Sequence, residues 1–361
     1  MIKTCSTFLN VRVGSPATSA PTFTFLKPGD AVEVDKTVAG TMLEGNNRWY
    51  KGAGEMYYWS GGFEKALSFS FRNLLTADPA KQVLNYNSLL EGIDKKWLST
   101  FGSGTQIAVL DSGFNPTHID LQKIKVINQK NFITDNEDVT DDSDRGHGSH
   151  ILGLIGGKFS GAKGIGGLAP AANYHVYKVL PSTEDASVEV LSKAWQDIEA
   201  NGFPDVVNMS LSISGLEYFS VKSFLDDFTT KTICIVAAGN NEELLADRKG
   251  LYALAKHPNV ISVGSVSKEF FLQNPDAVFH PRLDFIIPLV DLFSCSNSGS
   301  NAYKKLSGCS MATAIVSGIT SLLISARPEL KTNVGTIRTA LKDIALPYHS
   351  YLFSTFNLLK P

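Results

Sequence analysis

The sequence predicts an α/β protein with a doubly wound, mostly parallel sheet, preceded by a small all-β barrel. From residue 105 onward, continuous apolar runs alternate with amphipathic helix patterns, which is typical of a sheet covered by helices on both faces. Residues 1–63 instead show short alternating runs separated by turn residues. With 361 residues, 43% of them hydrophobic, the chain is long enough for one large domain and one small one.

The barrel is predicted from the first 63 residues. A turn at 27–30, Lys-Pro-Gly-Asp, is followed by Val32 and Val34 in alternation with polar residues. Aromatic residues that either pack in a core or line a ligand groove crowd one short region: Trp49, Tyr50, Tyr57, Tyr58 and Trp59. In "LNVR", "GDAVEV", "WYK" and "WSGG" this segment resembles the bacterial SH3-like family. The resemblance implies a targeting or regulatory role, with a peptide or a cell-envelope component as ligand.

Residues 64–104 show no periodic pattern and are predicted to be a linker that packs onto the large domain, residues 105–361. That domain begins with the buried strand "TQIAVL" and continues with "YHVYKVL", "DVVNMSLS", "TICIVAAG" and "NVISVGSV". Helix patterns lie between them, one of which stops at Asn201 and Gly202. In such a sheet the active crevice lies outside the carboxyl ends of the strands.

Composition excludes several classes of function. The formal net charge is -2 and no basic stripe is present, so we expect no nucleic-acid partner. No apolar stretch approaches the roughly 20 residues of a spanning helix, so no membrane span is expected. Four cysteines in 361 residues do not form a disulfide framework. The N-terminus lacks the apolar segment of a secretory signal, which predicts a cytoplasmic protein unless a leader is missing, with secretion or the cell envelope as the second possibility.

Four polar residues are predicted at the rim of this crevice. Asp111 and Asn240 follow buried strands, while His147 and Ser310 begin apolar helices. Each has an ordinary structural alternative, because aspartate and asparagine satisfy turns, histidine supports polar contacts and serine caps helices. His150, on the same helix as His147, is predicted to have only a supporting role.

The four residues occur in the chain order Asp111, His147, Asn240, Ser310, and the chain contains the motifs "IAVLDSG", "HGSH", "NMSL", "AAGN" and "GCSMA". In this order and these motifs it resembles the subtilisin-like serine peptidases, or subtilases, over about residues 90–345. The resemblance implies that Ser310 is the nucleophile of an acyl-enzyme mechanism. His147 is then its base and Asp111 orients the imidazole. Asn240 and the Ser310 N–H form the oxyanion hole.

The resemblance also implies a polypeptide substrate. It places one wall of the substrate groove, which pairs with an extended peptide, at Ser210, Leu211 and Ser212. It places the primary specificity pocket at Ala237, Ala238 and Gly239.

Three residues depart from the family pattern. Cys309 and Ala314 replace the threonine and proline of "GTSM-x-x-P", and Ser212 replaces a glycine. Cys309 either packs or reacts with thiol reagents, and Ser212 narrows the groove. These departures keep a second hypothesis open, a catalytically idle binding or scaffold protein on the same fold. A transpeptidase, which shares the acyl-enzyme, is a third.

The run "TDNEDVTDDSDRG" places six acids just before His147. Three interpretations of these acids are open: a solvated loop, the attraction of basic substrates, or a cation site. The positive charge of Arg145 opposes the second of these. Many subtilases hold calcium in the loop after the helix of the catalytic histidine, but here that loop, "KFSGAKGIGG", offers no obvious ligand. Asp120 matches another ligand position and cannot hold a cation alone. We therefore predict no metal and no cofactor, with calcium unsupported at the usual family site.

Overall fold

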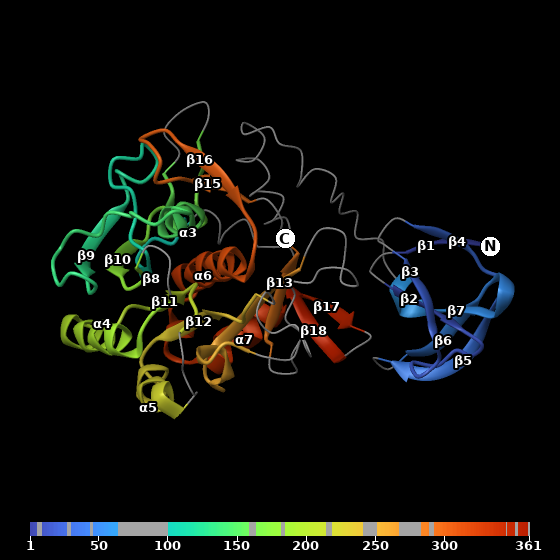
Figure 1. The fold of residues 1–361 in the computed structure, drawn as a ribbon. Coiled ribbons are helices and arrows are strands. Elements are labelled where there is room, and N and C mark those ends of the chain that lie inside the picture. The colour runs from blue at the N-terminus through green and yellow to red at the C-terminus, as the bar shows by residue number, and fades with distance from the viewer. Residues whose placement is uncertain are drawn as a thin grey trace. The chain divides into compact units, whose positions relative to one another are not determined.

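The computed structural model describes residues 1–5, 9–26, 30–43, 46–63, 100–158, 164–181, 185–213, 219–240, 251–266, 283–288, 292–343, 345–350 and 353–359. The chain divides into two compact units (Figure 1). The smaller unit consists of Met1–Phe71 and Tyr348–Thr355, and the larger of Arg72–Pro347 and Phe356–Pro361. Residues 64–99 of the predicted linker lie outside the described residues.

Strands dominate the described part of the smaller unit. A five-stranded antiparallel sheet has the order β3 (Thr22–Leu26), β2 (Leu9–Val13), β7 (Met56–Trp59), β6 (Asn46–Lys51) and β5 (Lys36–Leu43). A separate antiparallel pair joins β1 (Ile2–Thr4) to β4 (Ala31–Glu33). Short 3-10 turns span Ala53–Glu55 and Ser60–Phe63.

The aromatic residues of this unit form its core. Four of the five predicted aromatics are buried, namely Trp49, Tyr57, Tyr58 and Trp59, and Tyr50 packs against them half-buried. The indole N–H of Trp49 donates to the carbonyl oxygen of Thr41, and that of Trp59 donates to the carbonyl oxygen of Asn46. The burial of these four side chains, with both indole N–H groups hydrogen-bonded, favours core packing over a ligand groove.

A nine-stranded sheet forms the centre of the larger unit (Figure 1). Its order is β17 (Ala345–Ser350), β18 (Phe353–Leu359), β14 (Phe285–Pro288), β13 (Ile261–Val266), β12 (Ile233–Ala237), β11 (Val206–Met209), β8 (Gln106–Asp111), β10 (Asn173–Lys178) and β9 (Lys125–Asn131). Every pairing from β18 to β9 is parallel, which confirms the predicted α/β fold class. The connection from β8 leads toward β9, whereas the connection from its neighbour β11 leads the opposite way toward β12. An open sheet forms its crevice at such a switch point.

Helices and one hairpin surround this sheet. The helices are α3 (His147–Gly156), α4 (Val188–Asn201), α5 (Phe219–Phe228), α6 (Cys309–Ala326) and α7 (Val334–Asp343), with 3-10 turns at Leu254–Lys256 and Pro328–Thr332. The hairpin pairs β15 (Leu292–Cys295) with β16 (Tyr303–Leu306). As predicted, α4 ends at Asn201, and Gly202 follows with a φ of 93°.

Helix α6 is the central helix of the core. It is the one helix of the described residues that is long and apolar enough to cross a membrane, but 83% of it is buried inside the protein. Its N-cap is Gly308, whose φ of 132° favours glycine, and no side chain caps the helix. The sequence-based view of Ser310 as a helix cap is therefore wrong, because Ser310 already lies within the first turn. Its hydroxyl is free for another role.

Candidate active site

The predicted polar residues meet at the carboxyl edge of the sheet. Asp111 is the last residue of β8 and is buried. Its Oδ1 atom accepts a hydrogen bond of 2.8 Å from Nδ1 of His147 and another of 2.8 Å from the N–H of Ser112. Its Oδ2 atom is buried and has no hydrogen-bond partner among the described residues. The hydrogen bond to Oδ1 fixes the Nδ1 side of the His147 ring against Asp111.

Two glycines allow His147 to start its helix against β8. Gly146 adopts a φ of 56°, and a Cβ atom there would lie 2.4 Å from the side chain of Asn297. A Cβ atom on Gly148 would lie 2.0 Å from the carbonyl oxygen of Gly113. Both positions exclude side chains, so the glycines let the backbone approach closely enough for the contact between His147 and Asp111.

The surroundings of His147 favour its protonated form. Burial alone would lower the pKa of His147, but the charge and hydrogen bond of Asp111 oppose this, and the Asp141 charge adds to them. Arg145 works in the other direction, yet the pKa of His147 is raised overall. His150 differs, because burial lowers its pKa to about 3 and its Nε2 atom lies 2.9 Å from the carbonyl oxygen of Leu292. A neutral, buried His150 fits the predicted supporting role.

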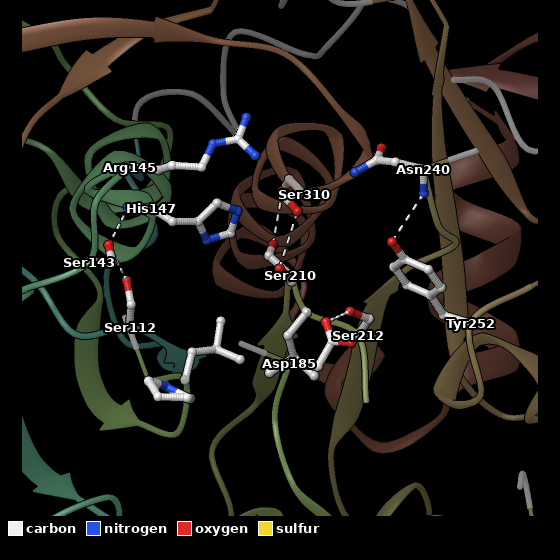
Figure 2. Close-up of a pocket in the computed structure, with 13 residues that line it drawn as sticks. Ser112, Ser143, Arg145, His147, Asp185, Ser210, Ser212, Asn240, Tyr252 and Ser310 are labelled. Carbon is white, nitrogen blue, oxygen red and sulfur yellow. Dashed lines mark hydrogen bonds between the residues drawn. The ribbon is translucent and has the colours of Figure 1, made fainter. Parts of the chain in front are cut away.

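Ser310 and Ser210 exchange two hydrogen bonds. The Ser310 hydroxyl donates to the carbonyl oxygen of Ser210 at 3.1 Å, and the Ser210 hydroxyl donates to the carbonyl oxygen of Ser310 at 2.9 Å. Ser310 and His147 line the same pocket, and the imidazole points toward Ser310 in Figure 2. The Ser310 hydroxyl is therefore turned toward the backbone of Ser210 in this structure.

Asn240 lies across the pocket from His147 (Figure 2). Its Oδ1 atom accepts the N–H of Cys309 at 3.1 Å, and its backbone N–H donates to the hydroxyl of Tyr252 at 3.3 Å. Because Oδ1 is engaged by an N–H, the amide is oriented with its NH₂ group toward the pocket. The first turn of α6 presents N–H groups that have no acceptor inside the helix. Together these groups form a site suited to a negatively charged oxygen.

A pocket of about 240 Å³ joins these residues. It is lined by Ser112, Ser143, Arg145, His147, Leu180, Pro181, Asp185, Ser210, Leu211, Ser212, Asn240, Tyr252 and Ser310. All three residues of the predicted groove wall are included. The residues of the predicted specificity pocket, Ala237, Ala238 and Gly239, are buried at the end of β12 and do not belong to this lining.

Sequence reasoning missed six of the lining residues, namely Ser112, Ser143, Leu180, Pro181, Asp185 and Tyr252. Leu180, Pro181 and Asp185 follow the carboxyl end of β10, and that position was an available signal for them. Tyr252 lies in a segment with no local pattern, and only its contact with Asn240 reveals it.

The departures from the family pattern have separate structural consequences. Cys309 is fully buried and burial raises the pKa of its thiol to about 11, which favours packing over reactivity. Ala314 is buried inside α6. Ser212 belongs to the pocket lining, where its hydroxyl donates to the carboxylate of Asp185.

The acidic run before His147 is not uniformly solvated. Asp141 is buried, and the exposed Asp142 pairs at 2.6 Å with the buried ammonium of Lys178. Asp135 is exposed, with Lys130 at 3.5 Å. Much of the negative charge of this run is thus already engaged by protein groups.

Within the described part of the chain, one cluster has the residue types of a metal site: His118, Asp120 and Cys295, all buried. Protein groups already engage two of its members. His118 Nε2 lies 2.9 Å from the carbonyl oxygen of Ala302, and Asp120 Oδ2 accepts the N–H of Ile165 at 2.8 Å and the hydroxyl of Tyr303 at 2.7 Å. These bonds engage Oδ2 of Asp120 and Nε2 of His118 with protein groups.

The comparisons with known proteins agree with this geometry. Residues 102–354 match the model of the subtilase family. The chain belongs to the subtilase family. This subtilase is 29% identical over 245 residues to subtilisin DY from Bacillus licheniformis, covering 68% of this chain and 84% of that protein. It is 30% identical over 258 residues to subtilisin E from Bacillus subtilis strain 168, covering 71% of this chain and 63% of that protein.

A solved structure of a cold adapted subtilisin-like serine proteinase has the same fold as this subtilase. The TM-score is 0.59 at 24% identity, and the match covers 72% of this chain and 89% of that one. Family membership and the two relatives support a serine endopeptidase as the class of enzyme.

Proposed function

We propose that this subtilase hydrolyses peptide bonds through an acyl-enzyme formed on Ser310, with His147 as general base and Asp111 as its partner. The observation that carries the proposal is the 2.8 Å hydrogen bond between Asp111 and His147 on a pocket that Ser310 also lines. A serine hydroxyl is a weak nucleophile at neutral pH and needs an adjacent base. The proposed chemistry uses side chains and backbone groups alone and requires no cofactor.

The mechanism begins when the Ser310 hydroxyl leaves Ser210 and gives its proton to Nε2 of His147 as Oγ attacks the substrate carbonyl. The NH₂ group of Asn240 and the backbone N–H of Ser310 bind the resulting oxyanion. His147 then gives the proton to the leaving amine, and a water molecule releases the acyl group by the same steps in reverse order. Asp111 holds Nδ1–H throughout, so that Nε2 is the atom that accepts the proton.

The test is covalent labelling of the folded protein by a fluorophosphonate probe. We expect stoichiometric labelling that is lost in Ser310→Ala and retained in Ser307→Ala, which removes an exposed serine three positions away. Failure of the wild-type protein to react would favour the idle scaffold. Product masses with and without an added amine then distinguish hydrolysis from transpeptidation, because only the acceptor of the acyl group differs.

For the smaller unit we propose the SH3-like role, in targeting or regulation through a peptide or cell-envelope ligand. Its five-stranded antiparallel sheet and buried aromatic core support this assignment.

Charge at the pocket supports a proposal about the substrate. Arg145 is exposed and lines the pocket beside His147, and none of the ion pairs among the described residues involves its guanidinium. Lys304, whose ammonium donates to the Arg145 carbonyl oxygen at 2.6 Å, adds a second positive charge on the same side. We therefore propose that the protein prefers peptides with an acidic side chain close to the cleaved bond.

Reversing this charge tests the substrate preference. In Arg145→Glu, we expect the ratio of kcat/KM for acidic over basic peptides of otherwise equal sequence to fall about tenfold. The variant loses the attraction between Arg145 and an acidic peptide side chain and replaces it with a repulsion, and each partly exposed charge pair contributes up to ~1 kcal/mol. Lys305→Glu, on the exposed part of β16 outside the pocket lining, is the control of equal net charge. An unchanged ratio in Arg145→Glu, or a wild-type preference for basic peptides, would refute the proposal.

A further inference from the structure

Asp141 differs from the other acids of its run because its carboxylate is enclosed by hydrogen-bond donors. Its Oδ1 atom accepts from the Ser112 hydroxyl at 3.0 Å, from the Ser143 N–H at 3.2 Å and from the Ser143 hydroxyl at 2.6 Å. Its Oδ2 atom accepts from the Ser149 N–H at 2.9 Å and from the Ser149 hydroxyl at 2.7 Å. The residue is only 4% exposed, so its carboxylate makes these hydrogen bonds inside the protein, away from water.

The same serines hold the first turn of α3, where His147 lies. The N–H of His147 donates to the Ser143 hydroxyl at 3.2 Å, and the N–H of Gly148 donates to the Ser112 hydroxyl at 2.9 Å. Ser149 donates its own N–H to Asp141 directly. Three consecutive N–H groups of the helix start therefore end on Asp141, either directly or through one serine, and its negative charge faces the positive end of the helix dipole.

The loop around Asp141 is also held from outside. The side-chain amide of Asn297 donates to the carbonyl oxygens of Asp141 at 3.1 Å and of Ser143 at 2.7 Å. Ser112, which binds the Asp141 carboxylate, follows Asp111 directly and donates its N–H to the Asp111 carboxylate. One network therefore fixes the backbone on both sides of the contact between His147 and Asp111.

We propose that Asp141 is a positioning residue of the catalytic site, which acts through Ser112, Ser143 and Ser149 to hold His147 against Asp111 and to stabilise the imidazolium. This inference depends on the proposed role of His147 as general base. It assigns to one buried acid a function that the solvated-loop, substrate-attraction and cation hypotheses for this run do not contain.

The charged groups near His147 define the expected pH effect. Asp111 faces the ring from β8, Asp141 and Arg145 come from the preceding loop, His150 lies on α3, and Lys304 lies on β16. Asp111 and Asp141 raise the pKa of His147, whereas Arg145 lowers it. Removing the Asp141 charge must therefore lower the pKa of His147. Because His147 must be neutral to act as a base, kcat/KM then stays high down to a lower pH. The acid limb of the pH profile, the range in which kcat/KM falls as the pH is lowered, moves to lower pH.

The experiment compares Asp141→Asn with Asp144→Asn, which removes an exposed charge from the same loop. In Asp141→Asn an amide NH₂ replaces an oxygen that accepts hydrogen bonds, so we expect α3 to shift at its start. We expect kcat/KM per fluorophosphonate-titrated site to fall about 10- to 100-fold, mainly in kcat, because displacement of a catalytic group by ~1 Å has effects of this size. The acid limb is expected to move to lower pH. In Asp144→Asn we expect both kcat/KM per titrated site and the position of the acid limb to remain nearly unchanged.

Full kcat/KM per titrated site, or an acid limb that moves no more than in Asp144→Asn, would overturn the proposal. Ser149→Ala, which keeps the carboxylate but removes one of its donors, provides a second variant if Asp141→Asn does not fold. We expect Ser149→Ala to lower kcat, and normal kcat would count against the positioning role. An NMR titration of the His147 ring in the wild type and the variants needs no enzyme activity. If the wild type is inactive but Asp141→Asn still lowers the pKa of His147, the proposed function fails while the contact with Asp141 stands. If the pKa of His147 does not change, the role of Asp141 is incorrect.

Discussion

Replacing Ser310 with alanine is expected to lower kcat about a million-fold, the size of loss that removing the nucleophile or the base causes in the related subtilisin. Without Oγ no acyl-enzyme forms, and His147 has no hydroxyl from which to take a proton. The Ser310 hydroxyl donates to the backbone carbonyl oxygen of Ser210, and we expect the variant without this hydroxyl to remain folded. The measurement is kcat on a fluorogenic peptide, with thermal unfolding as a check on stability.

The double variant Ser310→Ala with His147→Ala distinguishes a working triad from independent contributions. We expect it to be no slower than either single variant, because the nucleophile and its base act as one unit. Ser307→Ala is again the control and should retain full kcat. Residual activity of Ser310→Ala within tenfold of the wild type would mean that another group is the nucleophile.

Asp111→Asn is expected to lower kcat about 10⁴-fold. The amide retains the shape of the carboxylate, but its NH₂ group can donate to Nδ1 of His147 and so favours the tautomer with the proton on Nε2, which cannot accept the Ser310 proton. The hydrogen bond of 2.8 Å joins the two residues directly, so no intermediate group can compensate for the change. Kinetics on the same peptide measure the loss.

The pH profile of Asp111→Asn separates this explanation from a loss of folding. The Asp111 charge raises the pKa of His147, and the base must be neutral to act. Its removal therefore moves the acid limb of kcat/KM to lower pH. The exposed charge removed in Asp144→Asn should leave the limb in place. An acid limb in Asp111→Asn that coincides with that of the wild type would exclude the proposed pairing.

Local sequence patterns were sufficient for the strands around the site. The apolar runs that became β8, β10, β11, β12 and β13 are fully enclosed by the sheet and its helices, and such burial leaves a continuous hydrophobic signature. Asp111 and Asn240 were noticed because they interrupt that signature where strands end. Residues that close the pocket from irregular segments, such as Tyr252, give no periodic signal.

Local patterns misjudged residues whose role depends on distant partners. Ser310 matched a cap by residue type, but the N-cap of the helix is Gly308, two residues earlier than such a cap requires. Asp141 was indistinguishable from its acidic neighbours, because its burial depends on Ser112, Ser149 and Asn297, the last more than 150 residues along the chain.

By itself, the sequence determined the α/β class, the buried strands and the family to which the chain belongs, because the hydrophobic period and short motifs are local properties of the chain. Only the tertiary structure decided that Asp111 bonds His147, that Ser310 is turned toward Ser210 and that Asp141 lies beneath the helix start. Those contacts depend on which surfaces pack together. They also depend on which hydrogen-bond donors packing removes from water, because such donors must find acceptors within the protein. Contacts between segments so far apart in the chain are set by packing of the whole domain.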